Sequence, residues 1–194
     1  MSNLENSYFI KLSLARDTTT SRETLTKLSE AKYYYHERAI CEAIACNHNT
    51  PVSVLEKLST WFPIIEENSE SGDGDGVIGG VAANPNTPLH ILKKLATNDS
   101  EYVREQVATN KNTPADLLEK LAQDRYSYVL LAVANNINTP LSITQKTLEY
   151  LAGERDYKIR SAVLKHLHVT DIATEITQFV NREPEVSQSL LKNL

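Results

Sequence analysis

A five-residue phrase, Asn-x-Asn-Thr-Pro, recurs four times along this chain. The copies occupy residues 47–51, 84–88, 110–114 and 136–140. Their threonines, Thr50, Thr87, Thr113 and Thr139, are separated by 37, 26 and 26 residues. Repeats with periods in this range are typical of stacked helical units, which bury their apolar faces against one another. The phrase therefore predicts an all-α solenoid.

Each copy is expected to end one helix and start the next. Thr113 is the expected N-cap, because its hydroxyl can accept a hydrogen bond from a free amide in the first turn. Pro114 is expected at the first helical position, where its missing N–H costs no hydrogen bond, and Asp116 completes a pattern like a capping box. A degenerate copy at residues 20–23 has Ser21 in place of proline. Five helix starts are therefore predicted.

Apolar residues follow each phrase at the spacing of one helical stripe, as Leu117, Leu118 and Leu121 do after the third copy. The shorter segment before the phrase carries a second stripe, exemplified by Val103 and Val107. One repeat cannot bury both stripes alone. We therefore expect two helices per repeat and about five to six stacked repeats.

The spacing also shows where the array is interrupted. The 37-residue step contains an acidic insertion at residues 60–76, which begins with Trp61 and Phe62 and ends in a loop from Glu66 to Gly76. About four extra residues between Ser142 and Glu154 predict a longer helix.

Both ends of the array are expected to be capped, because a solenoid must cover its last apolar faces. Residues 1–16 form the expected N-terminal cap, with Tyr8, Phe9 and Leu12 as its apolar contacts. Two amphipathic segments predict a C-terminal helical cap at residues 169–194. With repeats over about residues 8–168, the whole chain, 1–194, is expected to be a single domain.

The string from Val107 to Pro114, followed by a Leu-Leu-x-x-Leu-Ala run, resembles the leucine-rich repeat variant family, which is close to HEAT-like and armadillo-like α-solenoids. The resemblance covers residues 15–168. It implies a right-handed superhelix of alternating α- and 3₁₀-helices, in which short segments such as 103–108 are 3₁₀ or weakly helical. Some members of that family carry a four-cysteine iron–sulfur cluster. This chain has two cysteines, Cys41 and Cys46, so no cluster, other cofactor or metal site is expected.

The charge and hydropathy of the chain limit its partners. There are 20 Lys and Arg against 25 Asp and Glu, a net charge of −5, which argues against a long nonspecific nucleic-acid footprint. The sequence has no run of about 18 apolar residues, and residues 1–6 do not resemble a secretory signal. We expect a monomeric cytoplasmic protein without a membrane segment.

Five lysines lie seven residues after their respective threonines: Lys27, Lys57, Lys94, Lys120 and Lys146. Stacking would line up these residues, called the lysine column, along one edge, where they can follow a phosphate backbone or an acidic peptide. The favoured interpretation is that they cover the solvent side of ordinary helices and were copied with the repeat, because they alternate with Glu56 and Glu119.

Two further groups are candidates for binding. Trp61 and Phe62 lie in the insertion, where repeat proteins often add function, although packing as an extension of the preceding helix is the favoured interpretation. The asparagines of the phrase can donate to a bound peptide, or they can satisfy carbonyl groups of neighbouring turns. The second interpretation is favoured, because irregular turns leave carbonyls unpaired.

The sequence contains no Ser-His-Asp arrangement, phosphate-binding glycine loop or His-Glu-x-x-His helix. We therefore predict a non-catalytic protein-interaction or scaffold module that binds another protein or peptide through the lysine column or through Trp61 and Phe62. One alternative is a HEAT-like nucleic-acid-binding protein or DNA glycosylase with a lysine-lined groove, which the net charge disfavours. Another is a structural or inhibitory protein that caps a single target.

Overall fold

The computed structural model describes residues 3–30, 38–60, 75–153 and 161, and all regular elements within them are α-helices. Ten helices occur in this described part of the chain. Their bounds are α1 Asn3–Arg16, α2 Arg22–Glu30, α3 Arg38–Cys46, α4 Val52–Leu58, α5 Asp75–Ala83, α6 Leu89–Leu95, α7 Glu101–Thr109, α8 Ala115–Leu121, α9 Ser127–Asn135 and α10 Leu141–Ala152. The all-α prediction is therefore confirmed for these residues.

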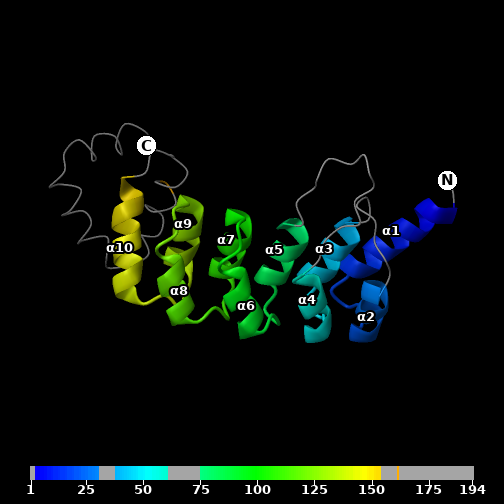
Figure 1. The fold of residues 1–194 in the computed structure, drawn as a ribbon. Helices are drawn as coiled ribbons and strands as arrows, with labels where there is room; N and C mark the ends of the chain where they lie inside the picture. Colours follow the sequence, from blue (N-terminus) through cyan, green and yellow to red (C-terminus); the bar gives the residue numbers. More distant parts are fainter. Residues whose placement is uncertain (1–2, 31–37, 61–74, 154–160, 162–194) are drawn as a thin grey trace. The chain divides into compact units, whose positions relative to one another are not determined.

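The chain divides into two compact units, residues 1–112 (unit 1) and 113–194 (unit 2). In unit 1, helices α1, α3, α5 and α7 lie side by side as a first row, and α2, α4 and α6 form a second row (Figure 1). Each second-row helix packs between two helices of the first row. The core fills the space between the rows, where both predicted apolar stripes are buried; its members include Ile40, Ile44, Leu55, Val77, Val81 and Leu92.

The first-row helices α3, α5 and α7 are each nine residues long and are α-helical. The expectation of 3₁₀ or weakly helical structure at residues 103–108 is therefore wrong. Val103 and Val107 are both fully buried. Residues four apart differ in direction by about 40° in an α-helix but by about 120° in a 3₁₀-helix, so burying this pair together favours the α form.

Unit 2 contains α8, α9 and α10 among its described residues, with α9 packed against both of its neighbours. Helix α10 has 12 residues, whereas α8 has seven. Leu148 and Leu151 lie in the added length and are fully buried. The predicted longer helix is confirmed, and its extra turn extends the core.

The sequence analysis predicted the apolar contacts of helix α1 only in part. Tyr8 and Leu12 are half-buried and Ala15 is fully buried, but Phe9 is 63% exposed. The prediction that Phe9 contributes to the N-terminal cap is wrong, because a residue next to Tyr8 points about 100° away from it around the helix. Its ring instead meets the ring of Tyr8 edge to face, with centroids 5.5 Å apart.

The insertion is shorter than the sequence suggested. Asp75 and Gly76, which were expected in the loop, form the first turn of α5. Trp61 and Phe62, the rest of the insertion and the predicted cap at residues 169–194 lie outside the described residues.

The helix starts differ from the prediction by one residue. Helices α4, α6, α8 and α10 each begin directly after the proline, so proline and not threonine is the N-cap. Pro51 has φ −65° and ψ 151°, and its carbonyl accepts hydrogen bonds from the N–H groups of Val54 and Leu55. No side-chain cap is formed at Pro114, so the capping box expected with Asp116 is absent.

The threonine hydroxyl serves the preceding helix. Thr50 Oγ1 donates to the carbonyl of Ile44, and Thr87 Oγ1 to that of Val81. The same six-residue contact occurs at Thr20 and Thr139. The last four carbonyls of a helix have no partner within that helix. The threonine therefore closes one helix, and the proline, whose φ is already fixed, opens the next.

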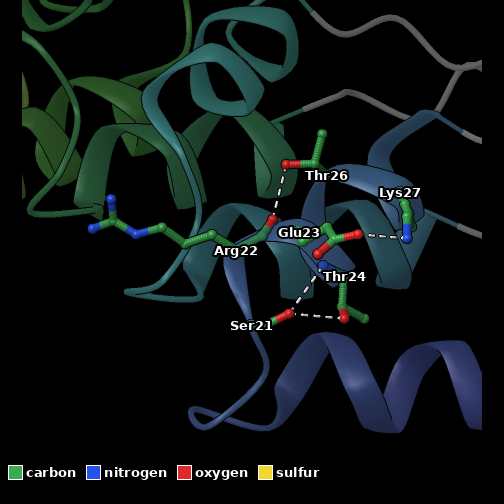
Figure 2. A network of polar contacts seen from close by, with 6 residues as sticks. All are labelled: Ser21, Arg22, Glu23, Thr24, Thr26 and Lys27. Carbon is green, nitrogen blue, oxygen red and sulfur yellow. Dashed lines mark hydrogen bonds and ion pairs between the residues drawn. The ribbon is translucent and has the colours of Figure 1, made fainter.

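The degenerate copy supports this division of roles. At the position of the missing proline, Ser21 Oγ accepts a hydrogen bond from the N–H of Thr24 at 3.2 Å and also contacts the Thr24 hydroxyl (Figure 2). In the same turn of α2, Lys27 Nζ lies 2.7 Å from Glu23 Oε1. Serine thus supplies by a side-chain cap what proline supplies elsewhere by its backbone geometry.

Candidate functional site

The asparagines of the phrase form a continuous series of hydrogen bonds in unit 1, here called the amide ladder. Asn47 Nδ2 donates to the carbonyls of Ala15 and Asp17, both at 2.9 Å. Asn84 Nδ2 donates to Ala45 and Asn47, at 2.7 and 2.9 Å. The Asn110 amide repeats this pattern toward Ala82 and Asn84. Each amide therefore bonds the preceding helix end and the preceding turn.

The second asparagine of each phrase adds to the ladder. Asn86 has its N–H bonded to Asn84 Oδ1, and its own amide donates to the carbonyl of His48. In unit 2, the N–H of Asn138 likewise donates to Asn136 Oδ1, and its side-chain amide donates to the carbonyl of Thr113, the threonine of the preceding phrase. The interpretation that these asparagines satisfy turn carbonyls is confirmed. Because these amide protons are already used, the phrase is scaffold.

The ladder starts at Asp17, a position that the sequence analysis missed. Asp17 Oδ1 accepts from the N–H and the hydroxyl of Thr19, at 2.8 and 2.7 Å. Both hydrogen bonds lower the pKa of the Asp17 carboxyl, and the bond from the Thr19 hydroxyl is the larger cause. Asp17 takes the place of the first asparagine in the first copy of the turn. In later copies the asparagine amide also donates to the preceding turn, but in this first copy an acceptor alone is sufficient. The signal was the spacing of 30 residues from Asp17 to Asn47.

The lysines of the lysine column are exposed, but two of them are engaged within unit 1. Lys27 pairs with Glu23 on its own helix, and Lys57 Nζ donates to the carbonyl of Ser29 near the end of α2. Lys94 is exposed in the last turn of α6. At least one lysine of the column, Lys57, therefore bonds a backbone carbonyl of a neighbouring helix.

The remaining column residues, Lys120 and Lys146, belong to unit 2 and are also exposed. Lys146 lines a groove of about 490 Å³ together with Glu119, Leu130 and Tyr150. Trp61 and Phe62, the other predicted binding residues, lie outside the described residues. Their roles and that of the column stay predictions.

A different set of side chains meets on the first row of unit 1, over the glycines of α5. A β-carbon at Gly76 would lie 3.1 Å from the Glu42 carboxylate, and one at Gly79 would overlap Cε1 of Tyr102. One at Gly80 would lie 2.9 Å from Sγ of Cys46. Because these glycines have no side chains, Glu42 and Cys46 of α3 and Tyr102 of α7 can lie directly against the backbone of α5.

The electrostatics of this cluster are consistently acidic. The pKa of Tyr102 is raised by burial and then by Cys46, Glu42, Glu105 and Asp75. Burial raises the pKa of Glu105. Cys46 is exposed as a residue, but its thiol rests against Gly80, so burial, assisted by Glu42, raises the thiol pKa. We call these five residues, Glu42, Cys46, Asp75, Tyr102 and Glu105, the acidic face.

Within the described residues, Glu42, Asp75 and Glu105 have no ion pair. A groove of about 340 Å³ adjoins the acidic face between α1 and α3, and Glu42 and Cys46 line it together with Arg16 and His48. The described part of the chain contains no group of three or more His, Cys, Asp or Glu residues arranged to hold a metal ion.

The sequence did carry a signal for this site. Glycine inside a helix costs about 1 kcal/mol relative to alanine, so a glycine pair flanked by Val77 and Val81 at helical spacing requires a packing or functional reason. The adjacent glycine-rich insertion concealed it. No helix in the described ranges is both long and apolar enough to cross a membrane.

The paired helices and the amide ladder define a helical-repeat protein. Residues 103–125, which include most of α7, the third copy of the phrase and α8, match the sequence profile of the leucine rich repeat variant family. The resemblance inferred from the sequence is thereby confirmed over these residues. Searches of curated proteins and of solved structures give no significant match.

Proposed function

We propose that this chain is a non-catalytic protein-interaction module that binds another protein or a peptide. In this proposal, residues 1–194 form one right-handed solenoid of about five to six repeats in the cytoplasm. The family match and the paired helices support it, because repeat scaffolds commonly present extended binding surfaces. The amide ladder supports it indirectly, since the asparagines repeated in each phrase are used internally, which leaves the positions where the repeats differ for contact with a partner.

The observation that carries the proposal is the acidic face. It collects side chains from three successive first-row helices, α3, α5 and α7, on a floor of helical glycines. Neither the glycines nor the partial burial of the Glu105 carboxyl favours the isolated fold, because glycine weakens a helix and burial disfavours an ionised carboxylate. Features that oppose local stability often mark functional surfaces. We therefore assign partner binding to this face first.

The lysine column and the Trp61–Phe62 pair are the competing surfaces. The nucleic-acid alternative depends on the column alone, and it draws less support because Lys27 and Lys57 already contact protein groups. A DNA-binding track would require these ammonium groups to be available to phosphates.

Affinity capture followed by mass spectrometry tests the proposal when it is repeated with one variant for each surface. We expect Tyr102→Ala with Glu42→Gln to lose the partner. Variants with Lys94, Lys120 and Lys146 changed to Gln, or with Trp61→Ala, should keep it. Far-UV circular dichroism checks that each variant is folded. Retention of the partner by the acidic-face variant would contradict the assignment of the face, and tight, salt-sensitive binding of duplex DNA would favour the alternative.

A further inference from the structure

We propose that the outer side of helix α1 binds a second copy of this chain, so that two molecules form a dimer through an α1–α1 contact. This side carries four neighbouring residues, Phe9, Ile10, Ser13 and Leu14, here called the outer face of α1. The contact lies at one end of unit 1 and uses no residue of the acidic face. It gives a dimer in place of the monomer expected from the sequence.

Helix α1 is apolar on two opposite sides. Its inner side packs against α2 and α3, with Leu12 half-buried and Ala15 fully buried. Residues two apart in an α-helix point about 160° away from each other, so Ile10 and Leu14 point away from Leu12. These two side chains are nevertheless large and apolar, and they are 54% and 39% exposed. A helix that is apolar all round is normally covered all round, which indicates that the outer face is also a contact surface.

Helix α1 stands at the end of the first row (Figure 1). Within unit 1, α3 and α5 each lie between two first-row helices, whereas α1 packs chiefly against α3 in this row. The last helix of a stack needs a polar outer side to remain soluble. The outer face instead carries three large apolar side chains, of which Phe9 is the most exposed. A helix from a second molecule would continue at this end the packing that already joins the first-row helices.

The outer face contains no ionisable side chain. In a two-fold dimer each face meets its own copy, so a charged residue at its centre would be repelled by the same residue of the other molecule. An uncharged apolar face avoids this repulsion and is complementary to itself. Arg16, in the last turn of α1, lies at opposite ends of an antiparallel helix pair and is kept apart from its copy. The charges of α1 therefore favour a second copy as the occupant.

The size of the outer face sets the strength of the dimer. Helix α1 has 14 residues and is therefore about 21 Å long. One helix pair of this length buries less than the roughly 1,200–2,000 Å² of a standard interface, so the contact belongs with the weak, transient ones. We expect a monomer–dimer equilibrium with a dissociation constant of about 10–100 µM.

Sedimentation velocity of the purified full chain, at concentrations from about 1 µM to 1 mM, tests the dimer. We expect the weight-average mass to rise from that of one chain toward that of two. A monomer over the whole range would overturn the proposal. Growth beyond two chains would also overturn it, because a two-fold contact closes on itself.

Ile10→Glu tests the outer face. It should weaken the dimer by about ten-fold or more, because it places an unpaired charge in the contact. Ile137→Glu makes the same change in a turn of unit 2, where Ile137 is 89% exposed, and should have no effect. Equal dimerisation of Ile10→Glu and the wild type would contradict the proposal.

Urea unfolding of monomeric samples checks that the effect of Ile10→Glu is on association. Because Ile10 points outward, the variant should be as stable as the wild type at low concentration. A strongly destabilised Ile10→Glu beside a wild type that stays monomeric would show that the same chain covers the outer face, and the proposed dimer would be wrong.

A cross-link distinguishes the two-fold contact from binding of the outer face elsewhere on a second molecule. Ser13 is exposed near the middle of the outer face, so in the dimer it lies near its own copy. Ser13→Cys, in a Cys46→Ser background that removes the exposed native cysteine, should give a disulfide-linked dimer on mild oxidation. Ser53→Cys, at an exposed position of α4, should remain monomeric in the same background. Equal cross-linking at both positions, or none for Ser13→Cys, would refute the α1–α1 contact.

Discussion

The side-chain amide of Asn84 donates to the backbone carbonyl of Asn47, 2.9 Å away in the preceding repeat. A second bond from the same nitrogen reaches Ala45, and Asn84 itself is only 2% exposed. Asn84→Ala should therefore lower the free energy of unfolding by about 2–4 kcal/mol, because it leaves buried carbonyls without donors. Urea denaturation measures this loss. Asn86→Ala, at a less buried position, should cost less, and equal losses would contradict the ladder's buried role.

The location of the N-cap can be tested at Ser21. Ser21→Ala removes the acceptor for the Thr24 N–H and should cost about 1 kcal/mol. Ser21→Pro restores the phrase found at Pro51 and should stay close to the wild type, since fixed φ offsets the lost cap. Urea midpoints compare the two variants. A larger loss for proline than for alanine would show that Ser21 does not occupy the proline position.

Substitutions at two lysines of the lysine column should differ in their effect on the free energy of unfolding. Lys57→Met removes the donor to the carbonyl of Ser29 and should lower the free energy of unfolding by about 0.5–1.5 kcal/mol. Lys94→Met, at an exposed position of α6, should remain within about 0.5 kcal/mol of the wild type. Thermal or urea unfolding of both variants measures the difference. Identical behaviour would argue that the column is energetically uniform.

The contact between Gly79 and Tyr102 predicts that the effect of Gly79→Ala on the free energy of unfolding depends on the side chain at position 102. Gly79→Ala places a β-carbon where the Tyr102 ring lies, so the ring must move, and the variant should gain none of the stability that alanine usually adds to a helix. In a Tyr102→Ala background the same substitution should stabilise by up to about 1 kcal/mol. A double-mutant cycle by urea unfolding measures the coupling. Additive effects would show that the two residues do not interact.

Displacing the ring should also change its ionisation. Burial and the neighbouring acidic groups raise the pKa of Tyr102, so moving the ring away should bring that pKa down toward its ordinary value. Nuclear magnetic resonance of labelled tyrosine, assigned with Tyr102→Phe, follows this titration in Gly79→Ala. An unchanged pKa would mean that the ring keeps its place.

Asp17 predicts a dependence on pH. Its folded-state pKa is lowered, chiefly by the Thr19 hydroxyl and then by the Thr19 N–H, so ionised Asp17 favours the folded state. This contribution is present above the unfolded pKa of about 3.9 and is lost as pH falls through the lower folded value. Asp17→Asn cannot titrate, so the stability advantage of the wild type over this variant should shrink in acid. Urea midpoints at neutral and acidic pH test this; a constant difference would contradict it.

The sequence predicted the succession of paired helices because a copy of the phrase lies directly before α4, α6, α8 and α10 and the apolar stripes repeat with it. It placed the helix starts one residue early, since a threonine hydroxyl can either cap the next helix or close the previous one. At Thr50 the carbonyl of Ile44 lies within reach and accepts the bond. Local pattern cannot decide between two acceptors that are both produced by folding.

The acidic face was harder to predict. Glu42, Asp75 and Tyr102 are far apart in the chain, and they meet because the first-row helices stack and because Gly76 and Gly79 leave room above α5. Repeat alignment emphasises what the copies share, such as the lysine column. The acidic face instead depends on the glycines of α5, which replace the side chains that other repeats have there. Such a site can be recognised only once the packing of the helices is known.

The amide ladder joins residues at three unequal separations along the chain. The equivalent bonds from Asn47, Asn84 and Asn110 span 30, 37 and 26 residues, yet each reaches the same point of the preceding turn. The alignment of one repeat on the next is thus set by hydrogen bonds between the turns and does not depend on the number of residues between them. The connection from α4 to α5 is consequently a position where evolution or an engineer can graft new sequence, while the turns on either side continue to recognise each other.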